Sequence, residues 1–138
     1  MAKKFIKQDA NVLLAAYNGR KDEYEALRAT GKWSGAILHA GILLELALKL
    51  VICKHIGEQK LPVMFQIHDL ELLLYCSGLN QNVLNNSALQ LNFKIVVSRW
   101  SMDLRYQGAT ATRAEADLVH KALYDSVNGA LTFLSQYL

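Results

Sequence analysis

The sequence predicts an all-α protein, an up-and-down bundle of four to five helices that forms one domain over residues 1–138. Three observations support this fold class. A chain of 138 residues has the usual size of one domain, and 52% of its residues are hydrophobic, which is enough for a buried core. One proline and eight glycines leave few helix breaks. No run of four or more residues alternates convincingly between polar and apolar, so no strand is expected.

The first two helices are expected over residues 9–29 and 33–55. Near Asn18-Gly19 we expect an interruption of the first helix, because neither residue favours a helix interior. The part of this helix after the expected interruption, residues 21–29, carries acidic residues first and an arginine last, which is the order that the helix dipole favours. A glycine after it is typical of a helix end.

The second helix contains the most hydrophobic stretch of the chain, residues 36–53. His39, Glu45 and Lys49 lie within this stretch, and charged groups are costly inside a bilayer, so we expect a core helix and no membrane contact. The spacing of Glu45 and Lys49 predicts an ion pair within the helix. Because the helix is apolar on all sides, it needs cover on every side. We therefore predict a homodimer that buries part of this helix or its neighbour, which a monomer in light scattering would exclude.

Three further helices are expected after a loop that contains the single proline. Asp69 is expected to cap a short helix that ends near residue 77. A polar loop is expected over residues 80–86, followed by a helix over residues 87–103 with apolar side chains at helical spacing.

A loop is expected over residues 105–111, before the last helix. Thr112 and Glu115 match a capping box, in which both side chains bind backbone amides that have no partner within the helix. The last helix is expected to run from there almost to Leu138. Its apolar stripe is Val119, Leu123, Val127, Ala130 and Leu134.

Charge and motifs exclude several classes of function. The formal net charge of +3 lacks the basic excess of a dedicated duplex-binding protein. The sequence contains no glycine-rich phosphate loop, nucleophile elbow or metal-ligand cluster, so neither a metal nor another cofactor is expected. Polar residues interrupt the basic N-terminus where an export signal would be apolar, and we therefore expect a cytoplasmic protein.

Three stretches, taken in their order and spacing, resemble the HEPN family (higher eukaryotes and prokaryotes nucleotide-binding) over about residues 9–138. They are Trp33-Ser34-Gly35-Ala36 with His39-Ala40 and Leu44-Glu45-Leu46-Ala47-Leu48-Lys49; Leu61-Pro62 with His68-Asp69-Leu70; and Arg105-Tyr106 before a long amphipathic helix.

The resemblance implies a helical bundle that is usually a homodimer. HEPN proteins act in toxin–antitoxin pairs, phage defence and RNA processing, often beside a small nucleotidyltransferase. Active members are metal-independent ribonucleases with an arginine and a histidine separated by four to six residues. The branch that carries the Arg-Tyr signature, here Arg105-Tyr106, is usually non-catalytic.

Arg113 and His120 are the candidate catalytic pair, with six residues between them. RNA cleavage needs a base and an acid for its proton transfers, and histidine suits both because its pKa lies near neutrality. Arginine suits the phosphate because its guanidinium binds two oxygens at once. Seven residues along a helix return to nearly the same face, so both side chains could reach one cleft. Alternatively, the two are ordinary surface residues.

Arg99, Arg105, Tyr106 and Arg113 are the candidate binding residues for a nucleotide or RNA. Aromatic rings stack on bases, and cations beside them bind the phosphates. In the alternative interpretation, Arg105 instead pairs with Asp103 or with an acidic residue of the first helix.

The sequence thus supports three hypotheses. The first is a HEPN-like dimeric binding or regulatory module of a toxin–antitoxin or phage-defence system, which pairs with a nucleotidyltransferase or binds nucleotide or RNA without cleaving it. The second is a metal-independent HEPN ribonuclease that uses Arg113 and His120. The third is a purely structural dimerisation domain.

Overall fold

The computed structural model describes residues 8–138, and these fold into helices with no strand among them, which confirms the all-α fold. The expectation about the N-terminal export signal concerns residues that lie mostly outside this part. The α-helices are α1 (Ala10–Ala29), α2 (Trp33–Ile56), α3 (Leu70–Cys76), α4 (Asn80–Leu84), α5 (Ser87–Arg99), α6 (Arg113–Tyr124) and α7 (Ala130–Leu134). Short 3₁₀ helices are η1 (Val63–Phe65), η2 (Met102–Tyr106) and η3 (Ser135–Tyr137).

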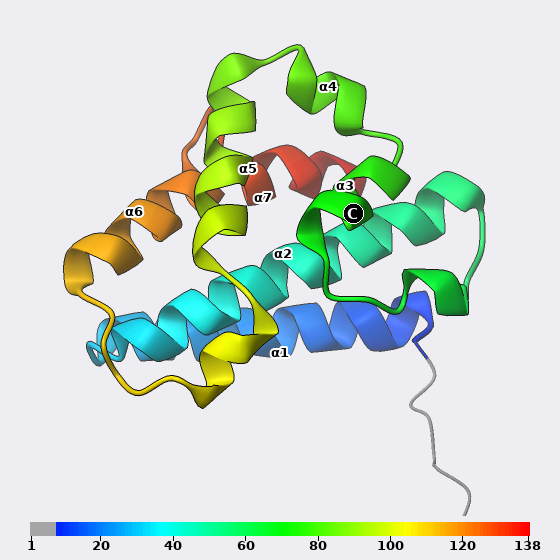
Figure 1. The fold of residues 1–138 in the computed structure, drawn as a ribbon. Coiled ribbons are helices and arrows are strands. Elements are labelled where there is room, and N and C mark those ends of the chain that lie inside the picture. Colours follow the sequence, from blue (N-terminus) through cyan, green and yellow to red (C-terminus); the bar gives the residue numbers. More distant parts are fainter. Residues whose placement is uncertain (1–7) are drawn as a thin grey trace, which may run out of the picture.

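Helix α2 is the centre of the bundle. Figure 1 shows α1 beside it and α5 crossing over it, and α2 also packs against α3, α6 and α7. It is long and apolar enough to cross a membrane, but 83% of its most apolar window is buried inside the fold, as in a core helix. One chain therefore supplies most of the cover that α2 needs. This weakens the reason for which the dimer was predicted, and the dimer itself stays a prediction.

Helix α1 is continuous, so the interruption expected near Asn18-Gly19 is wrong. Its buried side chains, Leu13, Tyr17 and Tyr24, lie on both sides of the glycine at spacings of four and seven residues. They form one stripe against α2. Packing along this stripe outweighs the cost of about 1 kcal/mol for a glycine inside a helix.

Residues 80–86 contain the short helix α4 and not the loop that their polar composition predicts. Val83 is buried and holds the helix against the core. The amide of Val83 donates to the carbonyl of Leu79 at 3.2 Å. A single buried apolar residue among asparagines and glutamine gives no periodic pattern from which the sequence could predict this helix.

Helix α5 ends at Arg99, four residues before the expected end at Asp103. Trp100 adopts an extended backbone, and its indole N–H donates to the carbonyl of Leu38 in α2 at 2.9 Å. The ring lies against Gly41, where a Cβ atom would come within 2.1 Å of it. This close approach of α2 and the indole fixes the end of α5.

The last predicted helix is broken into α6 and α7. The carboxylate of Asp125 accepts the amides of Val127 and Asn128, at 3.3 and 2.8 Å, and so forms a turn. At Gly129 a Cβ atom would lie 2.5 Å from the carbonyl oxygen of Leu123, so the turn has no room for a side chain. Val127, expected in the apolar stripe, is instead 78% exposed.

Two predicted caps are confirmed. The side chain of Asp69 accepts the amide of Leu72 at 3.0 Å, and Thr112 accepts the amide of Glu115 at 3.2 Å. The capping box is only half formed, because Glu115 binds the hydroxyl of Thr112 and makes no described bond to its amide. The carboxylate of Glu115 thus stays close to the start of α6.

Candidate functional site

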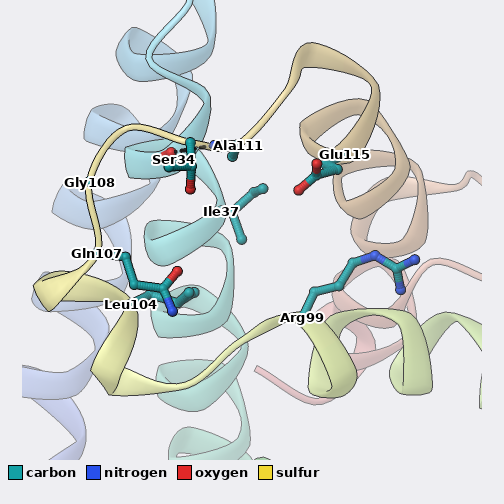
Figure 2. A pocket seen from close by; sticks show the side chains of 9 residues that line it. Ser34, Ile37, Arg99, Leu104, Gln107, Gly108, Ala111 and Glu115 are labelled. Carbon is teal, nitrogen blue, oxygen red and sulfur yellow. Dashed lines mark hydrogen bonds between the residues drawn. The ribbon is translucent and has the colours of Figure 1, made fainter.

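A cavity of about 190 Å³ lies where the first turns of α2, the end of α5, η2 and the start of α6 meet (Figure 2). The loop after η2 forms one wall, and it is held in place because the amide of Ala111 donates to the hydroxyl oxygen of Ser34 at 3.0 Å. The residues that line the cavity are Ser34, Ile37, Arg99, Leu104, Gln107, Gly108, Thr110, Ala111 and Glu115.

Arg99 and Glu115 bring opposite charges to this cavity from two different helices, α5 and α6. No ion pair joins them or any other carboxylate to Arg99 among residues 8–138. Arg99 donates to the hydroxyl oxygen of its neighbour Ser98 at 3.3 Å. Both charged groups are therefore available to a ligand.

Arg105 and Tyr106 lie in η2 next to the cavity but do not line it. The guanidinium of Arg105 lies 4.7 Å from the centre of the Tyr106 ring and donates to its hydroxyl at 2.8 Å. Both residues are exposed. The alternative partner of Arg105, Asp103, forms no ion pair with it. The expected pairing of a cation with an aromatic ring is present.

Arg113 is the first residue of α6 and is 78% exposed. Its Nε atom lies 3.6 Å from a carboxylate oxygen of Asp117, and its guanidinium lies 5.9 Å from the centre of the Trp33 ring. A carboxylate one turn along therefore offsets the unfavourable position of a cation at the helix N-terminus.

His120 lies in a cluster of aromatic residues between α1 and α6. Its Nδ1 atom is 2.7 Å from the hydroxyl of Tyr24, and its ring stacks on that tyrosine at 5.8 Å and lies 5.1 Å from Tyr124. Burial lowers the pKa of His120, with Arg28 nearby acting in the same direction. Burial also raises the pKa of Tyr24 to about 12.

The contacts of Arg113 and His120 differ, although both lie on α6. No described hydrogen bond or ion pair joins them, and His120 uses one ring nitrogen for Tyr24. Asp117 lies between them in sequence and binds Arg28 at 3.0 Å as well as Arg113. Their role as a catalytic pair stays a prediction.

The half-buried His120 gives a pH dependence of stability. The ordinary pKa of histidine is about 6.5. Since the pKa of His120 is lower than this in the folded protein, the unfolded chain binds the proton first as the pH falls. The free energy of unfolding of the wild type is therefore expected to decrease below about pH 6.5 more steeply than that of His120→Asn. Urea unfolding of both proteins at about pH 7.5 and about pH 5.5 measures this difference, and equal slopes would contradict it.

A polar network around α2 includes His68, for which the sequence predicts no partner. The predicted ion pair is confirmed, with the Nζ atom of Lys49 at 3.4 Å from Glu45, and both side chains are buried. His68 also binds Glu45, through Nδ1 at 2.6 Å, and Gln8 accepts from Lys49 at 3.4 Å. A glutamate inside an apolar helix needs several partners, and this need was the signal for His68.

A search of protein families found no match to the chain, and searches of curated proteins and of solved structures found none either. Within residues 8–138, no group of three or more His, Cys, Asp or Glu side chains is arranged to hold a metal ion. The resemblance to HEPN domains therefore stays an interpretation of the sequence.

Proposed function

We propose that the protein is a HEPN-like binding module that takes a nucleotide or an RNA strand at the cavity beside Arg99 and does not cleave it. The observation that carries this proposal is that Arg99 lines the cavity and forms no ion pair with a carboxylate of the described residues. Within the described part of the chain, Arg20, Arg28 and Arg113 each pair with a carboxylate, whereas Arg99 and Arg105 do not. Of these two unpaired arginines, only Arg99 lines the cavity. An arginine fork suits a phosphate, which it can bind through two hydrogen bonds.

The surroundings of the cavity support the same class of ligand. Tyr106 is 75% exposed, so a base can stack on its ring, and Arg105 adds a cation beside it. The homodimer, the nucleotidyltransferase partner and the toxin–antitoxin or phage-defence setting belong to this proposal through the resemblance alone.

Arg99→Ala is expected to raise the dissociation constant for a short single-stranded RNA about tenfold at low salt, because one phosphate contact is lost. Arg20→Ala is the matched control, since Arg20 pairs with Glu23 and does not line the cavity. Fluorescence anisotropy over a series of salt concentrations measures both affinity and salt dependence. Equal affinities for Arg99→Ala and the wild type, or no binding by the wild type, would contradict the proposal.

A metal-independent ribonuclease is the second candidate function. The protonation and the hydrogen bonding of the His120 ring favour it. Burial lowers the pKa of His120, so the neutral imidazole, which can accept a proton, predominates at neutral pH. Its Nε2 atom makes no hydrogen bond to the described residues, so one ring nitrogen is available for a proton transfer.

Incubation of the protein with a structured RNA in EDTA tests this second candidate. If His120 is catalytic, the wild type cleaves the RNA and His120→Ala does not, because the base of the reaction is lost. Arg113→Ala should then be impaired as well, while Arg20→Ala should cleave like the wild type. We expect no cleavage by any of these proteins under the first proposal, and cleavage by all four would indicate a contaminating nuclease.

A further inference from the structure

We propose that the cavity beside Arg99 recognises the Watson–Crick edge of a guanine base and that Glu115 is the residue that determines this specificity. This inference rests on the proposed function, since it names the base that the same site prefers. Figure 2 shows Glu115 and Gln107 on opposite sides of the cavity, with Ile37 between them.

The carboxylate of Glu115 is a matched acceptor for guanine. Guanine presents two neighbouring donors on its Watson–Crick edge, N1–H and the N2 amino group, and an ionised carboxylate offers two acceptor oxygens at a similar spacing. One oxygen of Glu115 accepts a hydrogen bond from Thr112 at 3.3 Å, and the other has no described partner. Since each carboxylate oxygen can accept two hydrogen bonds, both remain able to bind the base.

The other bases fit this acceptor less well. Adenine and cytosine each combine an amino group with a ring nitrogen that is itself an acceptor, so a carboxylate would meet a lone pair. Uracil offers a single N–H between two carbonyl groups. Guanine alone among the four common bases places two donors side by side on this edge, so Glu115 discriminates in its favour.

Further side chains complete the edge and the faces of the base. The amide of Gln107, on the side opposite Glu115, can donate to the N7 atom of guanine, an acceptor on the edge of the base that faces away from Glu115. Ile37, Leu104 and Ala111 supply apolar contacts for a planar ring. The volume of about 190 Å³ lies below the range of roughly 300–1,000 Å³ for sites of drug-sized ligands. It suits one base, with the phosphate at the rim of the cavity beside Arg99.

Binding of GMP and AMP to the full chain tests the inference. By titration calorimetry at low salt, we expect the wild type to bind GMP about tenfold more tightly than AMP, because a paired carboxylate edge discriminates by this order. Glu115→Gln replaces one acceptor with a donor while it leaves the Thr112 cap in place. It should lose the preference for GMP and keep its affinity for AMP. Glu58→Gln, an exposed glutamate outside the cavity, is the control.

The outcomes separate this inference from the proposed function. Equal affinities for GMP and AMP that both fall in Arg99→Ala would overturn the guanine assignment and retain the nucleotide site. A preference for GMP that persists in Glu115→Gln would overturn the role of Glu115. No binding of either nucleotide or of RNA by the wild type would overturn both proposals. Circular dichroism of each variant shows whether the fold is kept.

Discussion

Glu45→Leu is expected to lower the free energy of unfolding by about 3–5 kcal/mol. The substitution leaves the ammonium group of Lys49 buried, with only the amide oxygen of Gln8 at 3.4 Å as a partner. A buried charge without its counter-ion carries an uncompensated desolvation cost, which is larger than the gain from burying leucine. Urea unfolding followed by circular dichroism measures the change in unfolding free energy.

The double variant Glu45→Leu with Lys49→Met is the control for this effect. Both charges are then removed together, and two apolar side chains of similar length occupy the places of Glu45 and Lys49 in the core. We expect its stability to lie within about 1 kcal/mol of the wild type, since replacing a buried ion pair by apolar residues is often neutral. A single variant that loses less than about 1 kcal/mol, or a double variant as unstable as the single one, would show that burial of Lys49 does not set the cost.

Gly41→Ala is expected to destabilise the protein by about 3 kcal/mol although alanine favours helices. The added Cβ atom would lie 2.1 Å from the Trp100 ring, so the indole must move. Its movement strains the hydrogen bond to the carbonyl of Leu38 and shifts the neighbouring Arg99. Reduced affinity for RNA should therefore accompany the lower stability.

Gly19→Ala provides the matched control, because Gly19 also lies inside a long helix. A Cβ atom at this position meets nothing within 4 Å. We expect this variant to be more stable than the wild type by about 0.5–1 kcal/mol, since alanine restricts the unfolded chain. If both glycine variants were more stable than the wild type, the Trp100 ring could move away from position 41 at little cost in free energy, and the prediction for Gly41→Ala would be wrong.

Local signals in the sequence predicted most of the helices. Asp69 and Thr112 begin their helices with their own side chains, and such caps depend only on residues three positions away. The errors occur where distant contacts decide. The end of α5 depends on the bond from Trp100 to Leu38, which are 62 residues apart. The turn at Gly129 depends on crowding by the carbonyl of Leu123, which no pattern of apolar residues reveals.

The candidate site was predictable only in part, for the same reason. The charge of Arg99 beside an aromatic residue predicts a role in binding, whereas the capping box of Thr112 and Glu115 indicates no ligand role for Glu115. Gln107 carries no sequence signal, because it reaches the cavity next to a loop that is tied to Ser34 of α2 by a hydrogen bond between residues 77 positions apart. Arg105 and Arg113, by contrast, lie outside the cavity lining.

The close packing of Gly41 against the Trp100 ring also has an evolutionary consequence. Because a side chain at position 41 would displace the Trp100 ring, substitutions at the two positions are not independent of each other. A homologue with a larger side chain at position 41 should carry a smaller one at position 100, and such pairs of exchanges mark spatial contact. When divergent relatives are compared, covariation of these two positions would trace how the end of α5, and with it Arg99, has been held against α2 through descent.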